Sequence, residues 1–130
     1  MFKTNSMVRD YKNLEIELKK GDVCAVIFET IQGVGGLDMP KGDFICYMDK
    51  LCKQYGTCLI ADEVQSGFSR SGKFFAYQFN NIEPDIITMA KGMGNGFPVG
   101  GILKNSKIKP SIGLLGTTYG GNHLACIASI

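Results

Sequence analysis

The sequence predicts an α/β protein with a mostly parallel sheet and covering helices. Two apolar runs, residues 23–28 and 57–61, flank residues 42–55, where apolar side chains recur at helical spacing. Strand, helix and strand in this order are the pattern of a parallel βαβ unit. Glycine accounts for 17 of the 130 residues and gathers in three loops. Such clusters indicate places where the backbone turns sharply or approaches a ligand.

The first half of the chain is expected to contain a helix, a strand and a second helix. Residues 10–20 mix apolar side chains with Lys and Glu and are followed by Gly21, which predicts a short helix. Residues 23–28 are apolar throughout, as in a strand covered on both faces. Residues 42–55 carry apolar side chains at 44, 45, 47, 48, 51 and 52, a helical stripe that Gly56 ends.

The second half is expected to add three strands and a final helix. A strand at 57–62 is followed by a polar loop and by aromatic side chains at 74, 75, 77 and 79. Strands at 85–89 and 99–103 come next, and residues 121–130 begin an uncapped helix. A parallel sheet needs both faces covered, and one clear helix cannot cover them. We therefore expect the chain to be a piece of a larger protein.

Composition argues against several classes of protein. The net charge of +2 is too small to indicate nucleic-acid binding, and no apolar run approaches the roughly 20 residues of a membrane span. The five cysteines form no C-x-x-C pair and predict small buried residues in a reducing compartment. His123, the only histidine, has no partners at metal-ligand spacing, so no metal site is expected.

Three ionisable residues follow three apolar strands, at the edge of the sheet where ligands of open α/β proteins bind. These residues are Glu29, Asp62 and Lys91. An acid and an amine at neighbouring strand ends can hold one ligand that has a basic ring nitrogen and an aldehyde, as pyridoxal phosphate has. The alternatives are a solvated strand end at Glu29, a helix N-cap at Asp62 and a surface amine at Lys91.

A second interpretation of Asp62 and Glu63 is a magnesium site. An apolar run ending in Asp-Glu is also found in P-loop nucleotide hydrolases. Those proteins need a G-x-x-x-x-G-K-[ST] loop to hold phosphates, and this sequence contains none. The loop GTTYGGN at 116–122 offers two hydroxyl groups before a helix, which fits either a phosphate-binding loop or a plain helix cap.

Taken together, the segments resemble the class III (ornithine/acetylornithine-type) aminotransferases, which use pyridoxal phosphate on the fold-type I scaffold. The matching segments are FETIQG at 28–33, LIADEVQSG at 59–67, PD at 84–85, AKG at 90–92, GFPVG at 96–100 and GTTYGGN at 116–122. The separation of 29 residues between Asp62 and Lys91 is also similar to the family's. The resemblance covers residues 10–130, and it implies that the chain is part of the large domain.

The resemblance implies a role for each residue at the cofactor. Asp62 is expected to bind the pyridine nitrogen, with Glu63 beside it among the cofactor-binding residues. Val64 is expected to pack against a ring face, and Gln65 to bind the ring hydroxyl. Lys91 is expected to form the Schiff base with the aldehyde and to move the proton between substrate and cofactor.

The resemblance also implies a substrate side and a homodimer. Glu29 is expected to be the acid on the substrate side of the pocket. Thr118 is expected to bind the cofactor phosphate of the neighbouring subunit, and Thr117 to face that subunit's substrate. The expected reaction passes the terminal amine of an ornithine-like donor to 2-oxoglutarate.

Two residues depart from the family's pattern. Thr30 stands where the family usually has proline, and Val34 stands where most members have a second acid. Losing that acid alters the region that receives the distal group of the substrate. Donors with an acylated amine, such as acetylornithine or succinylornithine, are therefore expected to be accepted.

Members of the family are about three times as long as this chain, which indicates a large and a small domain. Residues 1–130 are expected to be a central fragment of the large domain, without the N-terminal segment and the C-terminal small domain, and inactive alone. The expected location is cytoplasmic, or mitochondrial in a eukaryote. The alternative of a different class is a non-catalytic piece that pairs with a partner chain through exposed sheet edges.

Overall fold

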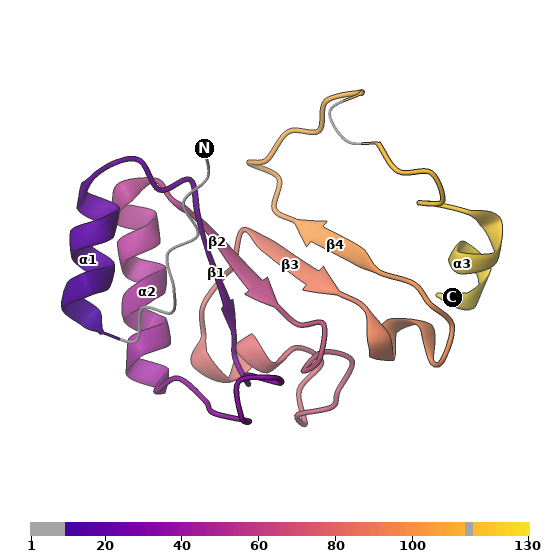
Figure 1. Cartoon of the computed structure of the whole chain (residues 1–130), viewed down its shortest axis with the longest axis horizontal. Helices are drawn as coiled ribbons and strands as arrows, with labels where there is room; N and C mark the ends of the chain where they lie inside the picture. Colours follow the sequence, from indigo (N-terminus) through magenta and orange to yellow (C-terminus); the bar gives the residue numbers. More distant parts are fainter. Residues whose placement is uncertain (1–9, 114–115) are drawn as a thin grey trace.

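The computed structural model describes residues 10–113 and 116–130, which form a four-stranded sheet with helices at its two ends (Figure 1). The strand order across the sheet is β1-β2-β3-β4. The elements are α1 (Tyr11–Lys19), β1 (Ala25–Glu29), α2 (Gly42–Tyr55), β2 (Cys58–Asp62), η1 (Ala76–Asn80), β3 (Ile86–Met89), η2 (Lys91–Gly94), β4 (Gly101–Lys104) and α3 (His123–Ala128).

The helices α1 and α2 lie side by side at the β1 end of the sheet (Figure 1). Asp10 caps α1, because its side chain accepts a hydrogen bond from the Lys12 N–H at 3.0 Å. Gly56 ends α2 in the left-handed conformation at φ 68°, which glycine adopts without steric cost. The helical stripe read from the sequence is confirmed: the buried residues of α2 are Phe44, Ile45, Met48, Leu51 and Cys52.

The register of the sheet places three polar residues in one row. Strand β2 is parallel to both β1 and β3, whereas β4 is antiparallel to β3. Glu29 pairs with Asp62, and Asp62 pairs with Thr88. Residues that pair across a sheet point to the same face. The expected parallel sheet is therefore confirmed, and its carboxyl edge carries a polar row.

The main hydrophobic core lies between the two helices and one face of β1 and β2. Leu14 and Leu18 of α1 meet the buried face of α2 together with Phe28, Leu59 and Ala61 of the strands. The expectation that β1 is covered on both faces is wrong, because Ile27 stays 61% exposed. Alternate residues of β1 face the helices and the open face of the sheet, so an apolar run does not by itself mean two covered faces.

A second, smaller core lies under the loop that follows β2. Phe75 of this loop is buried with Ile87 and Met89 of β3, and Phe68 and Met93 pack against them. The aromatic cluster expected from the sequence is confirmed by the edge-to-face contact of Phe74 and Phe75, whose ring centroids are 4.7 Å apart.

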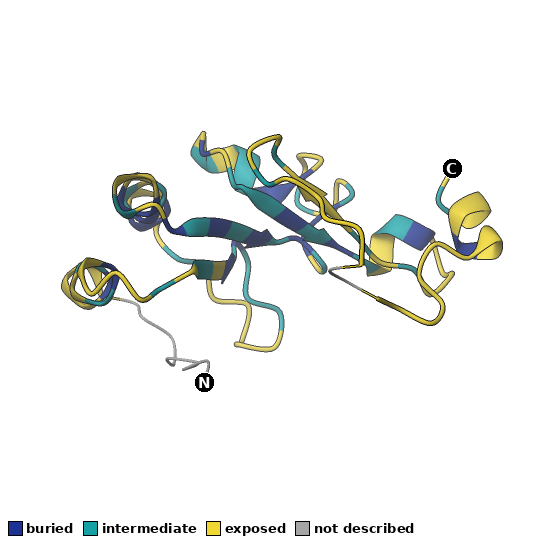
Figure 2. Ribbon diagram, turned by 90° about the horizontal axis from the view of Figure 1, so that it is seen from above, coloured by how far each residue is buried: buried dark blue, intermediate teal, exposed yellow. Residues whose placement is uncertain are grey.

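The C-terminal part is less buried than the centre of the sheet (Figure 2). In α3 only Ala125 is buried, and Asn122 caps the helix by accepting a hydrogen bond from the Ala125 N–H at 2.9 Å. The helix ends at Ala128, before the 130 end of the expected range. Strand β4 begins at Gly101, two residues later than expected.

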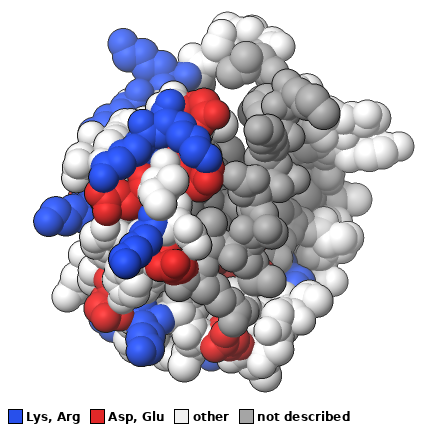
Figure 3. Space-filling view, turned by 60° about the vertical axis from the view of Figure 1, so that its left-hand side comes forward, with Lys and Arg blue, Asp and Glu red and all other residues white. Residues whose placement is uncertain are grey.

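Charged side chains of both signs mix over the face that carries α1 and α2 (Figure 3). Three salt bridges join residues three or four positions apart: Lys19–Glu15, Lys20–Glu17 and Lys53–Asp49. Such exposed pairs add little stability. Within residues 10–113 and 116–130, no helix combines the length and the apolar character needed to cross a membrane.

Candidate active site

Asp62 is the last residue of β2 and is half-buried at the carboxyl edge of the sheet. Its Oδ1 accepts two hydrogen bonds at 3.0 Å, from the Val64 N–H and from the Thr88 hydroxyl. Among the described residues, Oδ2 accepts no hydrogen bond. The two bonds fix the direction of the carboxylate and leave one oxygen to accept a hydrogen bond from a ligand.

Glu29 ends β1 directly beside Asp62. Its Oε2 accepts a hydrogen bond from the Gly33 N–H at 2.9 Å, which closes the loop after β1. Glu29 therefore has a structural partner, and its pairing with Asp62 places both residues on the same face of the sheet.

Lys91 begins η2, two residues after the end of β3. Its backbone is left-handed at φ 46°, an uncommon conformation for a residue with a side chain. The side chain is exposed, and its amine makes no hydrogen bond or ion pair with any described residue. Strain of this kind is found at functional sites when the surrounding structure holds it in place.

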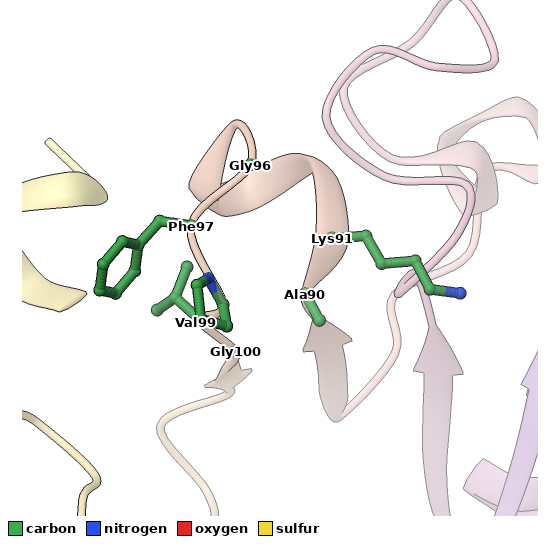
Figure 4. Close-up of a pocket in the computed structure, with 7 residues that line it drawn as sticks. Ala90, Lys91, Gly96, Phe97, Val99 and Gly100 are labelled. Atoms are coloured by element: carbon green, nitrogen blue, oxygen red, sulfur yellow. The ribbon is translucent and has the colours of Figure 1, made fainter.

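The amine of Lys91 extends toward the side of β3 on which β2 lies. Figure 4 shows its side chain pointing away from Phe97 and Val99, which lie on the β4 side. A shallow hollow of about 490 Å³ lies between Lys91 and residues 96–100. The amine thus leaves this hollow and extends toward the side on which β2 lies.

Gln65 lies where the loops after β1 and β2 meet. Its side chain is exposed, and its amide lies so close to Gly33 that a Cβ on Gly33 would overlap it. Glycine is therefore required at position 33 for this placement of the amide. Val64, the residue before Gln65, is half-buried and follows Asp62 directly. The Val64 N–H binds Asp62, whereas the Gln65 amide lies against Gly33.

Glu63 lies apart from the other residues expected at the cofactor. The side chain is fully buried and its two oxygens accept three hydrogen bonds from the protein. The side chain of Glu63 lies in the interior, so the structure does not place it beside the exposed groups of Gln65 and Lys91, and its expected part at the cofactor stays a prediction. The same burial argues against a magnesium site at Asp62 and Glu63.

Thr117 and Thr118 are exposed in the segment before α3. The Thr117 hydroxyl accepts a hydrogen bond from the Gly120 N–H at 3.2 Å, whereas Asn122 and not threonine caps the helix. The segment leads into α3, which lies beyond β4 at the opposite end of the sheet from α1 and α2 (Figure 1). The structure therefore does not bring these two hydroxyls into the row formed by Glu29 and Asp62.

Two residues with a part in the site were missed by the sequence reasoning. Thr88 orients Asp62 through its hydroxyl, and Gly33 leaves room for Gln65. The signal for Thr88 was a lone hydroxyl in an apolar strand, but its partner depends on the register between β2 and β3. No local signal separates Gly33 from the other glycines of its loop.

Comparison with known proteins gives one family. The sequence model described as aminotransferase class-III matches residues 2–130. The acetylornithine aminotransferase of Bacillus subtilis (strain 168) is 45% identical over 112 residues, which cover 85% of this chain and 29% of that protein.

Two solved structures are similar over nearly the whole chain. The ornithine aminotransferase of Plasmodium yoelii is 36% identical with a TM-score of 0.88, and the match covers 97% of this chain and 35% of that one. The ornithine aminotransferase of Toxoplasma gondii, whose active site holds PLP at partial occupancy, is 34% identical with a TM-score of 0.86 over 94% of this chain and 29% of that one. This chain thus spans about a third of the length of these proteins.

Proposed function

Because the chain belongs to the class-III aminotransferases, we propose that the whole protein transfers the terminal amine of an ornithine-like donor to 2-oxoglutarate. Ornithine donors with an acylated amine are included in this proposal. The family is one of enzymes, and its cofactor is pyridoxal phosphate. The observation that carries the proposal is the pair formed by Asp62, oriented with one free acceptor oxygen, and Lys91, whose unpaired amine extends toward the same strand end.

The residues present fit pyridoxal phosphate by their donor set. The ring nitrogen of the cofactor needs an acceptor, which Asp62 Oδ2 supplies, and the aldehyde needs an amine, which Lys91 supplies. When bound, the cofactor supplies a carbonyl group that bonds to amines and a ring that withdraws electrons from the neighbouring carbon.

Asp62 holds a proton at the ring nitrogen in this proposal. A carboxylate that faces a pyridinium gains a charge-assisted hydrogen bond, and the opposite charge favours the ionised acid. The Thr88 hydroxyl and the Val64 N–H both bind Oδ1 and keep Oδ2 directed at the ligand.

Lys91 acts as nucleophile and then as proton carrier in this proposal. With the cofactor bound, Nζ would hold its carbonyl carbon, the carbonyl oxygen leaving as water. Once free, the same Nζ would carry a proton from the substrate carbon to another atom. The left-handed backbone at Lys91 sets the direction from which the amine approaches.

The remaining residues fix the ligands in the same proposal. Val64 packs against one face of the ring and Gln65 donates to its hydroxyl group, while Glu29 meets the substrate. Thr117 and Thr118 are exposed, as residues that reach a second subunit must be. We therefore propose a homodimer in which Thr118 binds the cofactor phosphate of the neighbouring site and Thr117 faces its substrate.

The 130-residue chain alone is expected to be inactive. Lys91 and Gln65 are both exposed in it, so water reaches the groups that a working site must keep dry. The expected result with isolated chain and cofactor is no transfer from ornithine, whereas the whole protein transfers the amine.

Trapping the cofactor on its lysine tests the proposed function. The whole protein is mixed with pyridoxal phosphate, reduced with borohydride, digested and analysed by mass spectrometry. The expected label lies on Lys91 and is lost in Lys91→Ala. The matched control is Lys104→Ala, which removes an exposed lysine of the neighbouring strand β4 and should keep the label. A label that persists in Lys91→Ala contradicts the proposal.

A further inference from the structure

Glu63 is a fully buried acid to which the proposed function gives no role. Its Oε2 accepts from the Ser66 hydroxyl at 2.6 Å and from the Ala76 N–H at 3.0 Å, and its Oε1 accepts from the Tyr77 N–H at 2.8 Å. Burying a carboxyl group is costly unless such bonds replace its water. The three donors replace the water that the Glu63 carboxyl group loses on burial. Their positions show which segment Glu63 holds in place.

The three partners of Glu63 lie at the two ends of one loop. Ser66 is at the start of this loop, and Ala76 and Tyr77 are at its end, where η1 begins. Ser66 and Ala76 are themselves buried, with 4% and 0% of their surface exposed. The carboxyl group of Glu63 therefore ties the start of the loop to its end, ten residues later.

The tied loop contains strained backbone. Phe68 and Ser69 are consecutive residues in the left-handed region, at φ 56° and φ 64°. Each such residue with a side chain is strained and persists only when its surroundings hold it. The Glu63 bonds and the packing of Phe68 against Phe75 provide that hold.

The loop lies against Gly92, the residue that follows Lys91. A Cβ on Gly92 would lie 3.3 Å from the Cβ of Phe68, so the two backbones approach closely there. Met93, on the same turn as Lys91, packs in the small core with Phe68 and Phe75. The turn that carries Lys91 thus rests on the loop that Glu63 closes.

We propose that Glu63 is a positioning residue that sets Lys91 against Asp62. Glu63 directly follows Asp62 in the chain. Through the loop and Phe68 it also supports the strained turn that carries Lys91. The inference rests on the proposed function, because it assumes that Lys91 and Asp62 share one ligand. Glu63 itself stays buried and touches neither cofactor nor substrate.

The variants are chosen to separate positioning from mere stability. Glu63→Gln keeps the shape of the side chain but turns an NH₂ group toward N–H and O–H donors. Ser66→Ala removes one of the three bonds. Glu83→Gln is the matched control, because Glu83 is exposed. The pKa of Tyr77 is raised first by burial and then by the charges of Glu63 and Glu83. Both variants therefore remove a charge near Tyr77.

Hydrogen exchange of the whole protein without cofactor is the first measurement. In Glu63→Gln the amides of residues 67–69 and 91–94 should exchange about tenfold faster, the effect of losing one strong hydrogen bond. Glu83→Gln should leave both segments unchanged. Faster exchange at 67–69 with unchanged exchange at 91–94 overturns the proposal, because the loop then does not support the turn of Lys91.

Titration of the absorbance band of the lysine-bound cofactor is the second measurement. Glu63→Gln should shift the midpoint of this titration and lower cofactor affinity about tenfold, whereas Glu83→Gln should match the wild type. If the titration midpoint of Glu63→Gln equals that of the wild type, the inference is overturned while the proposed function stands. A wild-type protein with no such band refutes the proposed function, and with it the premise that Lys91 and Asp62 share one ligand. If Glu63→Gln does not fold, Ser66→Ala is judged by the same two results.

Discussion

Replacing Gly33 by alanine should displace the Gln65 amide without unfolding the protein. A Cβ on Gly33 would overlap the side-chain amide of Gln65, and the backbone at Gly33 does not require positive φ. Nonbonded carbon and nitrogen atoms come into contact at about 3.5 Å. The amide must therefore move by a distance on the order of 1 Å, and it can do so because its flexible side chain is exposed.

The size of the effect follows from the one bond that Gln65 is proposed to donate. A neutral hydrogen bond contributes about 0.5–1.5 kcal/mol, so the dissociation constant of pyridoxal phosphate should rise roughly two- to tenfold. The free energy of unfolding should change by less than about 0.5 kcal/mol, since an exposed side chain only rotates. Binding and stability thus respond differently to the same methyl group.

Equilibrium dialysis with pyridoxal phosphate and urea unfolding of the whole protein measure the two quantities. Gln65→Ala supplies the matched background, because the displaced group is absent there. In that background Gly33→Ala should have no further effect on binding. An unchanged dissociation constant in Gly33→Ala refutes the reasoning. So does a loss of affinity on Gly33→Ala that is equally large in the wild type and in the Gln65→Ala background.

Three further predictions concern Thr88, Thr30 and Cys52. Thr88→Val removes the hydroxyl that orients Asp62 and should weaken cofactor binding about tenfold in dialysis; Thr88→Ser should retain binding, and equal losses in both would contradict the role. Thr30 Oγ1 is buried without a partner among the described residues, so Thr30→Val should raise the free energy of unfolding in urea by about 1 kcal/mol; a decrease would show that the hydroxyl is used. Burial raises the pKa of the Cys52 thiol from 9.0 to about 12, so unfolding free energy should fall as pH rises from about 9 toward 12, and at pH 8 iodoacetamide should label exposed Cys46 long before Cys52.

The local part of the fold was predictable from the sequence. The helix at 42–55 was found with its bounds because its apolar stripe and Gly56 both act within a few residues. The ends of β1, β2 and β3 were found within a residue or two, because apolar runs stop where charged residues begin. Glu29 and Asp62 at neighbouring strand ends follow from a parallel register, which the order of elements already implies.

The longer-range part was not predictable in the same way. That Glu63 faces away from Asp62 follows from strand alternation, but its partners Ala76 and Tyr77 lie 13 and 14 residues away, across a loop whose path depends on packing. The left-handed backbone at Lys91 has no sequence signal, since lysine seldom adopts it. The exposure of Ile27 depends on which face of the sheet is covered, which a continuous apolar run does not reveal.

The central claim is that Asp62 and Lys91 hold opposite ends of one cofactor. A crystal structure of the whole protein grown with pyridoxal phosphate tests it most directly. The expected map shows continuous density from Lys91 Nζ to the cofactor and places Asp62 Oδ2 within about 2.6–3.2 Å of the ring nitrogen. A ring nitrogen that faces another group, or a cofactor bound while Lys91 Nζ remains free, would contradict the claim.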